Sequence, residues 1–189
     1  MKLLLHTCCG PCLLYPLDIL QQDGFEVTSY FYNPNIHPYK EFRRRLDSLL
    51  ELSVKSDISL ICHRDYDFNT FARQVVFNEE KRCAICYDIR LEETVKFAKN
   101  NEYSSFSTTL LYSVYQNHSL LRDKCSLLSK KYDISFVYHD FREGWQQGID
   151  LSIQNDLYRQ PYCGCIYSEQ ERYDNRLKKK LKKRKFTNK

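Results

Sequence analysis

Short apolar segments alternate along this chain with longer segments whose apolar residues recur at helical spacing, and this alternation limits the possible folds. The strand candidates are 2–6, 26–32, 58–62, 104–109 and 134–138, and the main helix candidates are 11–23, 39–55, 83–100 and 113–131. Strands joined by single helices favour a parallel sheet covered on both faces. We predict an α/β fold with a parallel sheet of about five strands flanked by helices, followed by a basic helical extension.

The first strand candidate, Lys2–His6, leads directly into a loop with three thiols, Cys8, Cys9 and Cys12. Pro11 falls where a helix would begin, a position that tolerates its missing N–H. The free N–H groups at the start of that helix would help to hold thiolates. The segment therefore predicts a soft-metal site at the end of a strand.

Seven of the nine cysteines fall into three tight groups: CCGPC (Cys8, Cys9, Cys12), CAIC (Cys83, Cys86) and CGC (Cys163, Cys165). The odd number and the close spacing argue against structural disulfides, so we predict a reduced, intracellular, metal-binding chain. Seven thiols exceed what one zinc ion needs, which favours an iron–sulfur cluster, with or without a further metal or a redox dithiol. One structural zinc ion with spare buried cysteines is the alternative. The remaining two, Cys62 and Cys125, lie in apolar segments and are predicted core residues.

Ligands of parallel sheets bind beyond the carboxyl ends of the strands. That rule places four segments at one edge: Cys8–Cys12, Asn33–Pro38, Thr108–Ser113 and Asp140. Asp140 is a candidate hard ligand for iron, and equally a helix cap or a partner of Arg142. His6, at the end of the first strand, is either a hydrogen-bonded bystander or a proton donor.

The formal net charge of +5 is concentrated at the C-terminal end. Residues 175–189 hold nine Lys and Arg and no acid, while the other 20 basic and 24 acidic residues give −4. We predict a catalytic domain over 1–170 and a basic tail over 171–189. The tail is either a solvated end or an arm for nucleic-acid phosphates. The absence of a long apolar run predicts no membrane span, and no nucleotide-binding glycine loop is present.

Five motifs occur in order between about Lys2 and Ser168: HTCCGPC, NPNIHPYKEFRRR, RCAICYDIRLEET, STTLLYSVYQNH and LYRQPYCGC. Together they resemble the QueH family, the cobalamin-independent epoxyqueuosine reductases. The resemblance implies a cytoplasmic oxidoreductase that removes the epoxide oxygen of epoxyqueuosine at the wobble position of tRNA, giving queuosine. It also implies a fold akin to nucleotide α-hydrolases, an electron donor that the sequence does not identify, and a substrate in the tRNA anticodon stem-loop.

The resemblance further implies a [4Fe–4S] cluster and an adjacent mononuclear iron bound by thiolate and aspartate, without cobalamin. Carried onto this chain, the cluster ligands are Cys8, Cys9, Cys83 and Cys86. Cys163 and Cys165 then serve the second iron or form a redox pair, Asp140 is the aspartate, and Cys12 is able to replace any of these thiols. His6, His37, a tyrosine or water would supply the proton.

Two other functions remain open at this point. An iron–sulfur tRNA sulfurtransferase on a related fold would need an ATP-binding loop, which this sequence lacks. A zinc- or cluster-binding module that interacts with tRNA without reductase activity needs only the thiols.

Overall fold

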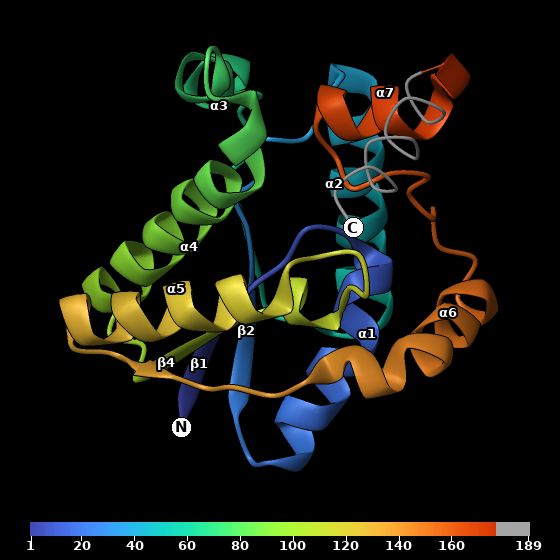
Figure 1. The fold of residues 1–189 in the computed structure, drawn as a ribbon. Coiled ribbons are helices and arrows are strands. Elements are labelled where there is room, and N and C mark those ends of the chain that lie inside the picture. The colour runs from blue at the N-terminus through green and yellow to red at the C-terminus, as the bar shows by residue number, and fades with distance from the viewer. Residues whose placement is uncertain (177–189) are drawn as a thin grey trace.

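The computed structural model describes residues 1–176, and the rest of the basic tail, 177–189, lies outside the described residues. A five-stranded parallel sheet forms the centre, with strand order β3-β2-β1-β4-β5 (Figure 1). The strands are β1 (Lys2–His6), β2 (Glu26–Phe31), β3 (Leu60–Cys62), β4 (Ser105–Thr108) and β5 (Ser135–Phe136). The predicted α/β class and the parallel sheet are confirmed.

Helices cover both faces of this sheet. The helices of the described residues are α1 (Gly10–Gln22), α2 (Tyr39–Lys55), α3 (Phe68–Val75), α4 (Arg82–Asn100), α5 (His118–Tyr132), α6 (Trp145–Gln154) and α7 (Ile166–Tyr173), with short 3-10 helices η1 (Glu79–Lys81), η2 (Thr109–Tyr112) and η3 (Phe141–Gly144). Helices α4 and α5 pack together on one side of the sheet, and α1 packs against α2 and α6 on the other (Figure 1). None of the helices in the described part of the chain has both the length and the apolar composition that a bilayer crossing requires.

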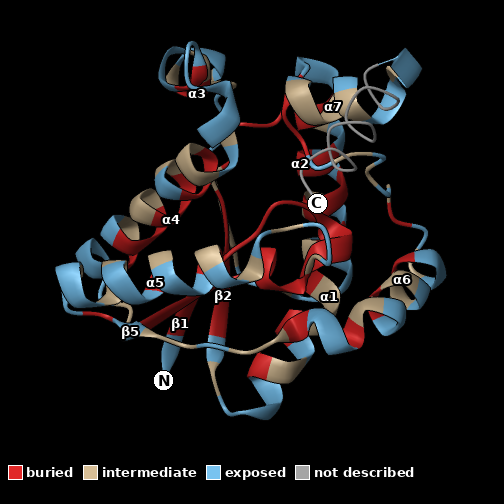
Figure 2. Ribbon diagram, in the orientation of Figure 1, coloured by how far each residue is buried: buried red, intermediate tan, exposed pale blue. Residues whose placement is uncertain are grey.

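The core is centred on β1. Leu3, Leu4 and Leu5 are all completely buried, although their side chains alternate between the two faces of the sheet. A central parallel strand is covered on both faces, which is why its sequence is a continuous apolar run and not an alternating one. Figure 2 shows the same pattern, with the strands and the inward faces of the helices buried.

The order in which strands are added to the sheet reverses between β1 and β4, although all strands run parallel. Strands β1, β2 and β3 follow one another toward one edge, whereas β4 returns to pair with the other side of β1. The connections after β1 and β4 therefore leave the sheet toward opposite faces, which is the arrangement that opens a binding crevice. The thiol loop after β1 and the η2 segment after β4 lie at this point of the sheet.

Three boundaries differ from the prediction. Helix α5 begins at His118 and not at Ser113, because η2 continues from β4 and the Asn117 side chain caps α5 by accepting from the Leu120 N–H at 3.1 Å. Strand β5 has only two residues, although the Val137 N–H still donates to Phe106 O at 2.9 Å. Helix α7 crosses the predicted boundary at 170, and the nine basic residues of 175–189 lie, Arg176 aside, outside the described residues.

Candidate metal centre

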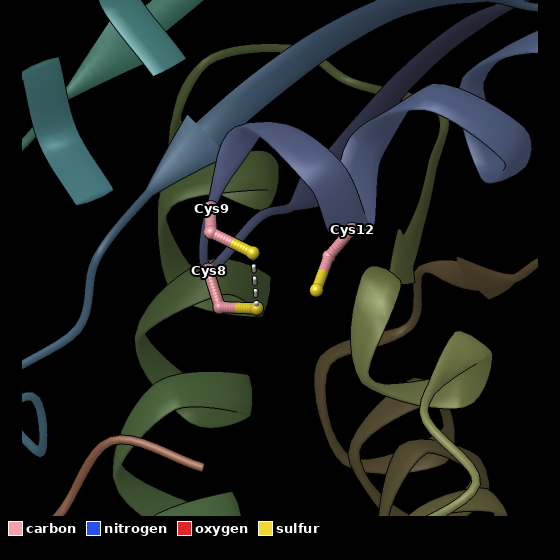
Figure 3. A group of neighbouring side chains, drawn as sticks. All are labelled: Cys8, Cys9 and Cys12. Carbon is pink, nitrogen blue, oxygen red and sulfur yellow. Dashed lines mark hydrogen bonds between the residues drawn. The ribbon is translucent and has the colours of Figure 1, made fainter. Parts of the chain in front are cut away.

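Cys8, Cys9 and Cys12, here called the triad, bring their sulfur atoms together at the start of α1 (Figure 3). All three are buried, and their sulfur atoms lie within 4.8 Å of one another. The Cys8 and Cys9 sulfurs are 3.7 Å apart. Within residues 1–176, no other set of three His, Cys, Asp or Glu side chains places its ligand atoms this close together.

The triad owes its geometry to the turn between β1 and α1. Cys9 is the extended residue that precedes α1, and Pro11 lies in the first turn, so Cys12 follows one turn later on the same side. Gly10 allows this turn to approach α2: a Cβ there would lie 3.1 Å from Ser48 Oγ and 3.3 Å from Ser48 O. The turn is therefore held between the sheet and α2.

The spacing of the triad matches the ligands of a single ion. A tetrahedral ion with metal–sulfur bonds of about 2.3 Å separates its sulfur ligands by about 3.8 Å. The 3.7 Å between Cys8 and Cys9 agrees with that value. Thiolates suit zinc and iron, so the residues present fit a soft metal ion.

The three thiols of the triad differ in the direction in which their pKa values are shifted. Hydrogen bonds from the Cys12 and Cys9 thiols, with help from the nearby Arg45 and Arg90 cations, hold the pKa of Cys8 well below its usual value. Burial raises the pKa of Cys9. The hydrogen bond that the Cys12 thiol donates to Cys8 raises the pKa of Cys12. The pKa shifts therefore favour negative charge on Cys8 over Cys9 and Cys12.

Cys83, Cys86, Cys163 and Cys165, here called the quartet, form a second group. Cys86 and Cys165 are buried beside Phe71 and Val75, whereas Cys83 and Cys163 are exposed. Burial raises the pKa of Cys86 to about 12. Burial raises the pKa of Cys83 as well, and the charges of Cys163 and Cys165 raise the pKa values of both Cys83 and Cys86 further.

Arg45 holds the quartet's CGC segment in place. Its guanidinium donates to Cys163 O at 2.9 Å and to Tyr162 O at 2.8 Å, and it pairs with Glu41 at 2.7 Å. Gly164 has φ +147°, a conformation that residues with a Cβ rarely adopt, and its carbonyl accepts from the His37 N–H at 2.8 Å. The CGC segment is thus fixed to α2 and to the loop after β2.

Two glutamines donate to thiols, one in each group. Gln160 Nε2 lies 3.2 Å from the Cys12 sulfur, and Gln116 Nε2 lies 3.1 Å from the Cys163 sulfur. The Tyr87 hydroxyl donates to Gln116 Oε1 at 2.7 Å, which fixes the orientation of that amide. Each glutamine therefore gives its thiol a fixed hydrogen-bond donor, the kind of partner that orients ligands in metal sites.

His6 ties the ends of three strands together. Its Nε2 lies 3.3 Å from Tyr32 O, so this nitrogen carries the proton, and its Nδ1 accepts from Thr108 Oγ1 at 2.9 Å. Complete burial, with the Arg90 charge nearby, lowers its pKa to about 3. His6 is therefore a neutral link between β1, β2 and β4, and its role as proton donor stays a prediction.

Asp140 does not join the thiols in this structure. It precedes η3, and its two carboxylate oxygens bind Arg142 at 2.7 and 2.5 Å, with His118 at 3.9 Å. The hydrogen bonds from Arg142 lower the pKa of Asp140 to about 2. Of the predicted alternatives, the structure has the cap and the Arg142 partner, while the role as iron ligand stays a prediction.

Two buried arginines, Arg45 and Arg90, were not among the site residues predicted from the sequence. Arg45 belongs to a run of three arginines, Arg43–Arg45, yet its side chain is only 1% exposed. Its position three residues after Phe42 and four before Leu49 is the signal that assigns it to the buried face. Arg90 follows Cys86 by four residues on α4 and is 2% exposed. The predicted core roles of Cys125 and, in part, Cys62 are confirmed.

Similarity to known proteins extends over nearly the whole chain. The family model "Epoxyqueuosine reductase QueH" matches residues 3–171. The protein of that name from Dehalococcoides mccartyi is 39% identical over 172 residues, which cover 91% of this chain and 94% of the relative. The one from Thermotoga maritima is 31% identical over 179 residues, which cover 89% of this chain and 91% of the relative. The one from Histophilus somni is 35% identical and covers 88% and 72%, respectively.

A solved structure supports the fold alone. The predicted subunit of a tRNA methyltransferase from Methanocaldococcus jannaschii has a TM-score of 0.55 and 13% sequence identity, over 81% of this chain and 74% of that one. The family match and the identities of the relatives show that this chain belongs to the epoxyqueuosine reductase QueH family.

Proposed function

We propose that this chain is an oxidoreductase that converts epoxyqueuosine in tRNA to queuosine, the activity for which its relatives are named. The observation that carries the proposal is the position of the buried triad, which lies where the strand order reverses between β1 and β4. In parallel α/β proteins that point binds the ligand. A redox-capable thiol group at this place is what a reductase of this family needs.

The reaction defines what the site must provide. Loss of the epoxide oxygen as water, with formation of a carbon–carbon double bond, consumes two electrons and two protons. When bound, an iron–sulfur group supplies electrons one at a time. The electrons come from an external donor, and the protons come from solvent or from a side chain in the crevice.

The two thiol groups suit two different metal groups. The triad spacing supports a single ion there. In a [4Fe–4S] cluster each thiolate binds a different iron, which keeps the thiolates farther apart, and no three sulfurs of the quartet lie within 4.8 Å of one another. We propose the single iron at the triad and the cluster at the quartet. The division carried over from the family resemblance, with Cys8, Cys9, Cys83 and Cys86 on the cluster, stays a prediction.

The protein's own residues prepare the crevice. The triad is buried, so water is excluded from most of its surface. The Thr109 hydroxyl lies 3.9 Å from the Cys8 sulfur, and the preceding Thr108 is bound by His6, which fixes the segment after β4 beside the triad. A modified anticodon base must leave its stack to reach such a site.

The test uses the full chain, reconstituted anaerobically with iron and sulfide. Incubation with dithionite and tRNA that bears epoxyqueuosine is followed by mass spectrometry of the nucleosides. We expect the epoxyqueuosine signal to convert to a species lighter by one oxygen atom, and the Cys8→Ser variant to give no conversion. Absence of conversion by an iron- and sulfide-loaded wild-type protein refutes the proposal.

A zinc-binding module without reductase activity is the second candidate, because the 3.7 Å between Cys8 and Cys9 fits zinc as well as iron. Metal analysis of anaerobically purified protein separates the two. A colourless protein with one zinc and no sulfide supports the module, and a brown protein with iron and sulfide supports the reductase.

A further inference from the structure

Arg90 is a buried cation without a carboxylate partner. Its side chain is among the largest that the fold encloses completely. No Asp or Glu among residues 1–176 forms an ion pair with it, whereas the other buried arginine, Arg45, pairs with Glu41 at 2.7 Å. The two guanidiniums are alike in burial and differ in how their charge is balanced.

Hydrogen bonds place the Arg90 guanidinium between the CAIC segment and the triad. Its Nε donates to Cys86 O at 3.4 Å, and its Nη1 donates to Asn33 Oδ1 at 3.3 Å. Asn33 in turn donates to Thr7 O at 2.9 Å, directly before Cys8. Arg90 Nη2 is buried and has no partner. The N–H groups of Nη2 are thus left without an acceptor between the CAIC segment and the residue before Cys8.

Of the groups that are negative when ionised, Cys86, Cys163 and Cys8 act on Arg90 most strongly, and they come one from each of the three cysteine groups. In return, its positive charge lowers the pKa of Cys8. Arg45 faces Cys8 and Cys9 as well, but Glu41 already balances its charge.

A buried guanidinium is costly unless an anion accompanies it. Arginine stays protonated in proteins, so it cannot escape the cost by losing its charge. A metal centre ligated by thiolates carries net negative charge, and that charge increases on reduction. The charge and hydrogen bonds around such a centre set its reduction potential.

We propose that Arg90 is the counter-ion of the metal–thiolate centre that the triad and the quartet form together, and that its positive charge raises the reduction potential of that centre. This inference rests on the proposed function, because it assumes that the thiols hold a reducible metal group. Arg90 acts through the centre as a positioning residue and is assigned no contact with the substrate. Its Nη2 is available to a sulfur acceptor of the loaded site.

The experiment compares the full-length wild type with Arg90→Met, Arg90→Lys and, as a control, Arg43→Met. Arg43 is exposed on α2 and pairs with Asp47, away from the thiols. Each protein is reconstituted anaerobically, its iron and sulfide are counted, and its midpoint potential is measured by a redox titration followed by electron paramagnetic resonance. The thermal midpoint is recorded before and after loading.

We expect Arg90→Met to fold without metal, to gain less thermal stability on loading than the wild type, and to show a lower midpoint potential. Loss of cluster uptake by this variant, with the metal-free chain still folded, supports the same role. Arg90→Lys keeps the charge and should lie near the wild type in potential, and Arg43→Met should match it.

Two results overturn the role of Arg90. One is an unchanged midpoint potential and loading gain in Arg90→Met. The other is failure of the metal-free Arg90→Met chain to fold, which would make Arg90 part of the scaffold. A wild-type chain that takes up no iron or sulfide instead refutes the proposed function itself, so the two failures are distinguishable.

Discussion

The triad and the quartet are both thiol groups, but they differ in where their cysteines come from and in what holds them. The triad lies within five consecutive residues on one strand–helix turn, and all of its members are buried. The quartet joins the start of α4 to the segment before α7, and half of its members are exposed. A short turn fixes a tight site by itself, whereas distant segments need anchors.

Those anchors are visible around the quartet. Arg45 and Gly164 hold the CGC segment, and Gln116 contacts the Cys163 sulfur. The triad needs fewer of them, because β1 and α1 already fix its geometry. The comparison therefore predicts that the quartet can be disturbed from a distance, while the triad is disturbed chiefly by changing its own thiols.

Changing the thiols themselves should have the largest effect. We expect Cys12→Ser to remove iron while sparing sulfide, and Cys86→Ser to remove sulfide together with most of the iron. Either change should lower reductase activity by more than about 100-fold, beyond the range typical of outer-shell partners. Cys62→Ser, a half-buried cysteine of β3, is the control for iron and sulfide content. Equal losses of sulfide from the Cys12 and Cys86 variants would contradict the division of the two groups.

Breaking the anchor of the quartet comes next. Glu41→Ala leaves Arg45 buried without its carboxylate and should lower the free energy of unfolding by about 3–5 kcal/mol. Glu51→Ala on the same helix removes an exposed pair with Lys55 and should cost no more than about 0.5 kcal/mol. Urea unfolding of both variants measures the difference. Similar values for the two would show that the buried pair does not anchor the site.

Gly164→Ala tests the backbone of the quartet. The new Cβ would sit at φ +147° and 3.3 Å from Asn35 Nδ2, so we expect a loss of about 1–3 kcal/mol in the free energy of unfolding. Gly24→Ala has a similar backbone strain, at φ +83°, but contacts nothing within 4 Å. Sulfide uptake should fall in the first variant alone. Retention of full uptake by Gly164→Ala would argue against a fixed CGC segment.

Asp140→Asn should have the smallest effect, because Asp140 lies apart from both groups. We expect unchanged iron content and a stability loss of at most about 1 kcal/mol at neutral pH, from the weakened cap and the lost pairing with Arg142. The folded pKa of about 2 lies below the unfolded value, so this contribution is complete at neutral pH and is lost as the pH falls toward 2. Denaturation at pH 7 and pH 3 should show the difference narrowing. Loss of iron from this variant would instead establish Asp140 as a ligand.

The sequence determined the fold and the triad. The alternation of apolar runs with helical segments predicted the parallel sheet, and the apolar run Leu3–Leu5 predicted a buried first strand. Local spacing also brought the triad together, because Cys8, Cys9 and Cys12 need only one turn of backbone to meet. Both are short-range properties, which is why periodicity and motif spacing captured them.

The charged residues around those thiols depend on tertiary packing. The spacing from Phe42 and Leu49 assigns Arg45 to the apolar face of α2, but only the packing of that face against the CGC segment, together with the pairing with Glu41, shows that its charged end is enclosed. The end of β5 likewise brought Asp140 to Arg142 and His118, and not to the thiols. The combined effect of the Cys86, Cys163 and Cys8 charges on Arg90 requires α4, the loop after β1 and the segment before α7 to be in place together. Contacts between residues so far apart in the chain are set by the global packing of the sheet and helices, and local sequence carries little information about them.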